Sequence, residues 1–218
     1  MLLANKILSI CIICLSSAVN ATDVDKAIFR PEVSSWKTLR DAGINKQDRD
    51  FSCGAAALST LLTYYFNQPI SEQEIIKRIG KESSYSLADL KRVAEEYGFR
   101  TLALAAEIQA LRNLKVPAIL YIQQDRIGVS SGHFTVLRTI GDQTVSLADP
   151  SLGNWKLNTQ RFQKLWETRD DKSLPGRMLI LLPPKSDTSI QVNAVFMQKP
   201  VDISDRLNDL HDIQSLSK

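Results

Sequence analysis

Five stretches of the chain combine apolar residues at helical spacing with residues that begin or end helices. They span residues 34–43, about 53–66, 71–80, 86–98 and 158–166. Two of them open on a serine, carry an acidic residue three positions later and close at a glycine. That order is typical of a capping box followed by a helix stop. The part of the chain before residue 100 is therefore predicted to be mainly helical.

Five later stretches are short runs rich in apolar and β-branched residues, bounded by turn residues, which predicts strands. They span residues 100–105, 116–122, 133–140, 144–150 and 177–182. Helices that precede strands with short connections favour an α+β fold. We expect an N-terminal helical part that packs on an antiparallel β-sheet.

The last predicted strand is followed by Pro183 and Pro184, which predict the end of the compact domain. The domain is thus expected to span residues 22–184, with residues 185–218 as a C-terminal tail. Four apolar residues of the tail share one helical face: Ile203, Leu207, Leu210 and Ile213. This pattern predicts an amphipathic helix that docks or pairs.

Residues 1–21 are typical of a secretory signal peptide. Lys6 precedes an apolar run from Ile7 to Leu15, and small residues follow up to Ala21. A membrane anchor is the alternative, but the run is short for a bilayer span. We expect cleavage after Ala21, a periplasmic location and no stable membrane insertion after the signal is removed.

Composition and charge indicate whether a nucleic-acid partner is expected. The chain has 218 residues, of which 44% are hydrophobic and 23% charged, which is ordinary for a globular protein. The formal net charge is +3, and both signs are interspersed. No basic cluster suggests nucleic acid as a partner.

Removal of the predicted signal peptide also removes two of the three cysteines. Cys11 and Cys14 leave with it, so Cys53 is the single cysteine of the mature chain. An unpaired thiol in an oxidising compartment is either buried and inert or retained for its chemistry. Cys53 starts a predicted helix, whose N-terminal dipole favours a thiolate, and Gly54 after it allows close approach of a neighbouring element.

A base for this thiol is sought among two histidines. His211 lies in the tail, whereas His133 opens a predicted strand after a run of small residues. If that strand and the next form an antiparallel hairpin through Gly141 and Asp142, Asp149 lies beside His133 at one end of the pair. This placement favours a Cys–His–Asp triad. Asp149 before a proline also predicts a turn.

The motifs QDRDFSCGAAALSTLL, GHFTVL and VSLADPSLGNW with a later FQKLW resemble the C39 peptidases over residues 34–182. These are papain-like cysteine peptidases that cleave leader peptides, often after a double glycine. The resemblance implies that Cys53 is the nucleophile, His133 the base and Asp149 its orienting partner. It also implies that the Gln47 side chain stabilises the oxyanion. It implies no metal or organic cofactor.

The resemblance further implies a function. The chain is similar to stand-alone periplasmic members, including the type that accompanies Fap functional-amyloid export. Its expected partners are a peptide or protein substrate and components of a secretion or amyloid-export system. Ser52 stands where exporter-fused members usually carry Asp. Two alternatives remain: a peptide-binding escort module without turnover, and another Cys–His–Asp enzyme, such as a transglutaminase-like protein or a cell-wall amidase.

Overall fold

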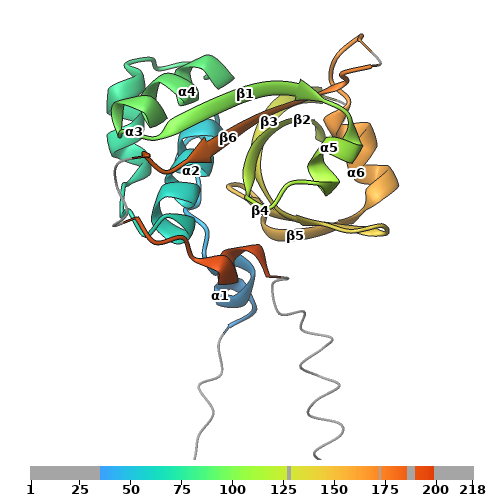
Figure 1. The fold of residues 1–218 in the computed structure, drawn as a ribbon, viewed down its shortest axis with the longest axis horizontal. Helices are drawn as coiled ribbons and strands as arrows, with labels where there is room; N and C mark the ends of the chain where they lie inside the picture. Colours follow the sequence, from blue (N-terminus) through green and yellow to red (C-terminus); the bar gives the residue numbers. More distant parts are fainter. Residues whose placement is uncertain (1–34, 127–128, 172, 186–189, 199–218) are drawn as a thin grey trace, which may run out of the picture. The chain divides into compact units, whose positions relative to one another are not determined.

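The computed structural model describes residues 35–126, 129–171, 173–185 and 190–198 (Figure 1). The predicted signal peptide and the predicted amphipathic stretch of residues 203–213 lie outside the described residues. Within the described ranges, no helix is long and apolar enough to cross a membrane.

The five helices predicted between residues 34 and 166 are present, and two short helices are added. Their bounds are α1 (Trp36–Asp41), α2 (Cys53–Thr60), the π-helix η2 (Leu61–Tyr65), α3 (Glu72–Ile79), α4 (Leu87–Glu96), α5 (Ile108–Arg112), α6 (Thr159–Trp166) and the 3₁₀-helix η3 (Ala194–Met197). Capping boxes open α3 at Ser71 and α4 at Ser86. Gly80 ends α3 with φ of 69°, a left-handed conformation that glycine adopts without strain. The short α5 was not predicted.

The strands form one antiparallel sheet, as predicted. They are β1 (Arg100–Ala106), β2 (Ala118–Arg126), β3 (Val129–Ile140), β4 (Thr144–Asp149), β5 (Gly153–Asn158) and β6 (Gly176–Leu182), in the order β1-β6-β2-β3-β4-β5. The edge strand β5 was not predicted, because its sequence GNWKLN begins with turn residues and carries polar side chains.

The prediction that His133 opens a strand is wrong. The strand β3 begins at Val129, and His133 lies inside it, opposite Ile122 of β2. The preceding small residues belong to the strand because β2 continues far enough to pair with them. A Cβ atom at Gly132 would lie 1.9 Å from the Tyr121 hydroxyl oxygen, so a larger residue there would displace the Tyr121 side chain.

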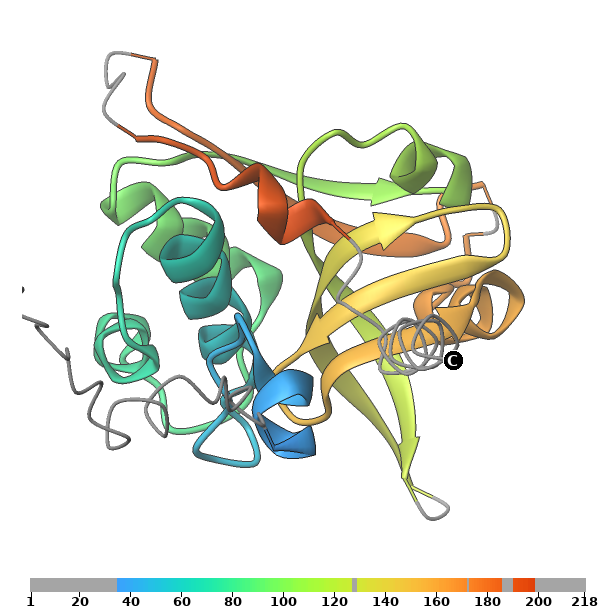
Figure 2. The same ribbon diagram turned by 90° about the horizontal axis from the view of Figure 1, so that it is seen from below.

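Two hydrophobic clusters hold the sheet between helices (Figures 1 and 2). The first cluster joins α2, α3 and α4 to one face, which includes Ile119 and Leu179. The second joins α5 and α6 to the opposite face, which includes Leu120 and Met178. Neighbouring residues of β2 and β6 thus serve opposite faces, as the two-residue period of a strand requires.

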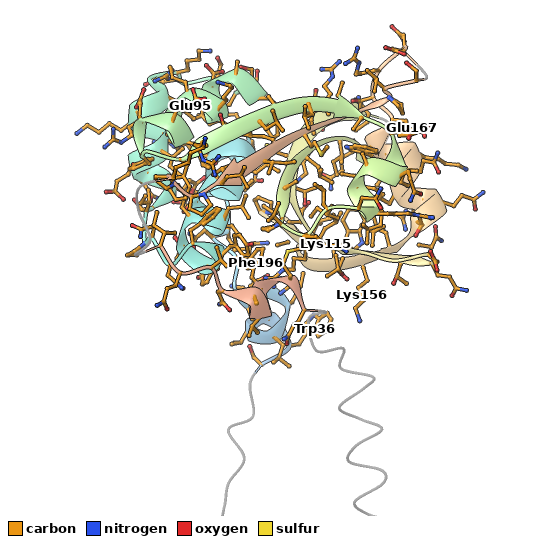
Figure 3. All side chains as sticks on the ribbon, in the orientation of Figure 1. Trp36, Glu95, Lys115, Lys156, Glu167 and Phe196 are labelled. Carbon is orange, nitrogen blue, oxygen red and sulfur yellow. The ribbon has the colours of Figure 1, made fainter. Side chains whose placement is uncertain are left out.

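The packed part of the chain continues beyond Pro184, where the sequence analysis placed its end. Phe196 of η3, which is labelled in Figure 3, is only 3% exposed, whereas the preceding Val195 is 63% exposed. The Arg138 guanidinium lies 4.2 Å from the centre of its ring and donates from Nη1 to its carbonyl oxygen at 3.1 Å. The backbone N–H of Asn193 donates to the Tyr65 carbonyl at 2.7 Å. These contacts join distant parts of the chain, so the sequence carries no local signal for them.

Candidate active site

The thiol of Cys53 lies at the first residue of α2. Cys53 is a free cysteine with 8% of its surface exposed. Ser52 precedes it as the N-cap residue but makes no side-chain cap hydrogen bond. Its hydroxyl instead donates to the Arg49 carbonyl at 2.9 Å. The first turn of α2 therefore offers N–H groups without a side-chain cap, next to the thiol.

Small residues bring this helix onto the sheet. All residues of α2 are buried. A Cβ atom at Gly54 would lie 3.0 Å from Phe134 Cδ2 and 3.3 Å from the Leu90 methyl carbons. A larger side chain would push α2 away from β3. The run of glycine and alanines after Cys53 therefore sets the distance between the thiol and the strand that carries His133.

His133 and Asp149 form a buried pair. His133 Nε2 lies 2.9 Å from Asp149 Oδ2, and the two side chains are 7% and 0% exposed. The predicted hairpin between β3 and β4 brings them together, although a register shift near Leu137 staggers the two residues. Because Nε2 faces the carboxylate, Nδ1 is the ring nitrogen left for the thiol.

The surroundings of this pair favour the protonated form of His133 and the ionised form of Asp149. Burial lowers the pKa of His133, but hydrogen bonds and charges of Asp149 and Cys53 raise it to about 9. Burial raises the pKa of Asp149, but the hydrogen bond and charge of His133 and the backbone N–H groups of Ser151 and Leu152 lower it to about 2. At neutral pH the imidazole is thus protonated between a carboxylate and the sulfur.

The other carboxylate oxygen of Asp149 builds the predicted turn. Oδ1 accepts from the Ser151 N–H, the Ser151 hydroxyl and the Leu152 N–H, each at 2.9 Å. The carboxylate therefore has one oxygen for the turn and one for His133. This division fixes the direction from which the imidazole is held.

Gln47 lies on the loop before α2, next to this turn. Its backbone N–H donates to the Pro150 carbonyl at 3.1 Å. Its side-chain Nε2 donates to the Arg49 carbonyl at 2.9 Å, and its Oε1 is buried without a hydrogen-bond partner. One N–H of the amide is thus engaged by the loop, and a second N–H remains.

A cavity of about 380 Å³ lies beside β3. Aromatic and aliphatic side chains share its lining with polar groups: Tyr85, Ser86, Leu87, Ala88, Tyr121, Phe134 and Arg177. Phe134 follows His133 directly, and Arg177 lies 5.5 Å from the centre of the Tyr121 ring. The cavity suits an apolar side chain of a peptide. In the described part of the chain, no group of three or more His, Cys, Asp or Glu side chains is arranged to hold a metal ion.

Residues 41–169 match the peptidase C39 family. The chain belongs to that family. The resemblance inferred from the motifs is therefore confirmed, and it places the chain among cysteine peptidases. Cys53, His133 and Asp149 all lie in the matched region.

A curated relative points the same way. The chain is 33% identical over 143 residues to the probable functional amyloid protease FapD of Pseudomonas aeruginosa. The matched region covers 62% of this chain and 62% of the relative, so it spans less than two thirds of that protein.

Solved structures of C39 peptidase domains share the fold. The peptidase domain of Streptococcus ComA, a bifunctional ABC transporter, is 17% identical with a TM-score of 0.54, over 64% of this chain and 97% of that one. A double-glycine motif protease from an AMS/PCAT transporter, solved with its leader peptide, is 22% identical with a TM-score of 0.52. That match covers 64% of this chain and 90% of the other. These likenesses confirm the papain-like α+β fold of the C39 domain.

Sequence reasoning did not find the residues around the triad of this C39 domain. Tyr85 and Tyr121 line the cavity from an α3–α4 connection and from β2, so no motif groups them. The motifs also gave no sign that Glu72 on α3 is buried. These residues come from separate elements, so only the fold shows where their side chains lie.

Proposed function

We propose that this chain is a periplasmic cysteine endopeptidase that cleaves exported peptides or proteins after a double glycine, in support of functional-amyloid export. The observation that carries the proposal is the buried, charged His133–Asp149 pair beside the Cys53 thiol at the N-terminus of α2. The similarity to a probable functional amyloid protease supports the amyloid role. The likeness to a double-glycine protease in complex with a leader peptide supports the substrate class.

The proposed reaction proceeds through a thioester. The Cys53 sulfur attacks the scissile carbonyl carbon, and its electron pair forms the S–C bond. The π-electron pair of the C=O bond moves to the carbonyl oxygen. The Cys53 backbone N–H and the free N–H of the Gln47 amide stabilise that oxyanion. His133 gives its proton to the leaving amine, and the C–N bond breaks. His133 then takes a proton from water, and the water oxygen attacks the thioester carbonyl carbon. The C–S bond breaks with its electron pair on sulfur, which releases the acid and restores Cys53 beside protonated His133.

The cavity lined by Phe134, the residue after His133, can bind a part of the substrate other than the two glycines. Glycines contribute no side chain to recognition, so affinity must come from residues further along the peptide. Tyr85, Tyr121 and Phe134 provide apolar contact area, and Arg177 provides a positive charge at the lining. We therefore assign this cavity to a residue of the substrate outside the glycine pair.

The test is cleavage of exported proteins encoded near this chain. Each protein is incubated with the wild-type chain, purified after export, and with Cys53→Ala. We expect new N-termini directly after two glycines with the wild type and none with Cys53→Ala, which should still bind the substrate. N-terminal sequencing of the exported enzyme should give Thr22. Cleavage by Cys53→Ala would refute the nucleophile, and binding without cleavage by the wild type would favour a peptide escort.

A further inference from the structure

Glu72 is a buried carboxylate outside the triad. It is 4% exposed and is the first residue of α3. Its two carboxylate oxygens accept from the backbone N–H of Asp48, at 3.3 and 3.2 Å. The side chain of its neighbour Gln73 donates to the Asp48 carboxylate. The start of α3 thus holds both the backbone and the side chain of one loop residue.

The loop held in this way carries the oxyanion residue. Asp48 directly follows Gln47, whose backbone N–H is bonded to the Pro150 carbonyl on the other side. The Lys46 ammonium donates to the Ser151 carbonyl at 2.7 Å. Gln47 therefore lies between two anchors: Glu72 of α3, and the turn that begins at Asp149.

A second set of hydrogen bonds holds the Gln47 amide itself, near Glu72. The Ser52 side chain is close enough to Glu72 to help lower the pKa of its carboxyl. The Ser52 hydroxyl also accepts from the Arg49 N–H at 3.1 Å and donates to the Arg49 carbonyl at 2.9 Å. That same carbonyl accepts from Gln47 Nε2. Glu72 therefore acts on Gln47 through the backbone of the next residue, Asp48, while the Arg49 carbonyl holds the Gln47 amide.

The energetics argue against a purely stabilising role for this carboxylate. Burial raises the pKa of Glu72, and hydrogen bonds from Ser52 and the Asp48 backbone offset this only in part. A carboxylate with a raised pKa is less stable as an anion in the folded protein than in water. An apolar side chain of similar size would avoid this cost. An apolar side chain, however, has no oxygen that could accept the hydrogen bond from the Asp48 N–H.

We propose that Glu72 is a positioning residue that holds the Gln47 loop so that the second N–H of the Gln47 amide points to the oxyanion. This inference rests on the proposed peptidase function. Glu72 touches neither the substrate nor the triad in this arrangement; it acts through Asp48 and Gln47. Loss of its acceptor oxygens should slow the chemical step and leave substrate binding and the thiol unaffected.

The main test compares two variants on a quenched fluorescent peptide that spans the cleavage site found in the experiment above. Glu72→Met retains the side-chain length without acceptors, and kcat should fall about 10-fold to 100-fold with KM nearly unchanged. Glu72→Gln retains an acceptor oxygen without the charge, and its kcat should stay within about twofold of the wild type. Tm should fall only slightly in either variant, because Asp48 is exposed and its backbone N–H can bind water instead.

Two further measurements separate positioning from general disruption. Alkylation of Cys53 by iodoacetamide forms no oxyanion, so its rate in Glu72→Met should equal that of the wild type. In a Gln47→Ala background, Glu72→Met should cause almost no further loss, because both residues act through one donor. As a matched control, Glu74→Met removes the capping box of α3 and should lower Tm without lowering kcat.

The outcomes are distinct. If the wild type cleaves no exported protein, the proposed function fails and this inference falls with it. If the wild type cleaves but Glu72→Met retains full kcat, the positioning role alone is refuted. An equal loss from Glu72→Met with and without Gln47, or a matching loss of alkylation rate, would also refute it.

Discussion

At the residue scale, the site depends on how charge is held in a buried place. Burial removes water from the His133 imidazole and lowers its pKa. The hydrogen bonds and charges of Asp149 and Cys53 raise that pKa by more than burial lowers it. The folded pKa of about 9 lies above the ordinary value of 6.5. Protonation of His133 therefore contributes its full stabilisation of the fold below pH 6.5, and this contribution is lost as pH rises through 9. Asp149 is ionised down to about pH 2. Both charges are therefore present at neutral pH.

The first residue-scale prediction concerns the alkaline limb of activity. In the proposed mechanism His133 must carry a proton for the leaving amine, so kcat/KM of the wild type should fall above about pH 9. Asp149→Asn removes a charge that raises the pKa of His133. Its alkaline limb should therefore lie at lower pH, in addition to an overall loss of rate. The measurement is kcat/KM against pH.

The matched control for this change is Asp142→Asn, because the Asp142 side chain is 97% exposed on the turn between β3 and β4. This variant should retain the wild-type pH profile. An alkaline limb that does not move in Asp149→Asn would show that the carboxylate does not hold the proton on His133.

At the element scale, close packing of helices on the sheet depends on a few glycines. Gly54 lets α2 approach Phe134, and Gly176 lets α6 lie against the start of β6. A Cβ atom at Gly176 would lie 2.1 Å from Trp166 Cε2. Trp166 is completely buried, and its N–H donates to the Arg177 carbonyl at 3.3 Å. The ring therefore has no free space into which it can move.

The element-scale prediction follows from this contact. Gly176→Ala should lower the free energy of unfolding by about 1–3 kcal/mol, the usual cost of overpacking a buried position. Gly141→Ala is the matched control, because a Cβ atom there meets only the Thr144 carbonyl oxygen at 3.7 Å. Denaturant unfolding of both variants measures the difference. Equal stabilities would show that α6 shifts without cost.

At the scale of the whole molecule, a C-terminal segment joins the helical part to the sheet. Residues 190–198 follow the family match, which ends at residue 169. Phe196 packs against Tyr65 at a ring distance of 6.0 Å and lies beside Arg138 of β3. Burial lowers the pKa of Arg138 to about 10. Its guanidinium also donates to the Gly43 carbonyl at 3.1 Å, on the loop that leads toward Gln47.

The whole-molecule prediction is a stability test of this segment. Phe196→Ala should lower the free energy of unfolding by about 3 kcal/mol, the lower end for loss of a buried Phe side chain. The neighbouring Val195 is 63% exposed, so Val195→Ala should change it by less than about 0.5 kcal/mol. Thermal or denaturant unfolding of the full chain compares them. Equal effects of the two variants would show that the segment does not hold the domain together.

Local signals in the sequence determined a large part of this protein. Capping boxes at Ser71 and Ser86, the glycine stops and the apolar periods lie within a few residues of the structure that they specify, so they predicted the helices and most strands. The family followed from motifs around Cys53, His133 and Asp149. The contact between His133 and Asp149 could be predicted because one short hairpin brings the two residues together.

Only the tertiary structure decided the rest, because it depends on contacts between residues far apart in the chain. The start of β3 was set by its partner β2, and the burial of Phe196 by Arg138. Glu72 meets Asp48 across 24 positions, and Lys46 meets Ser151 across 105. A glutamate at a helix start has the same local pattern whether its side chain faces water or holds the loop beside Gln47, so the fold alone distinguishes the two.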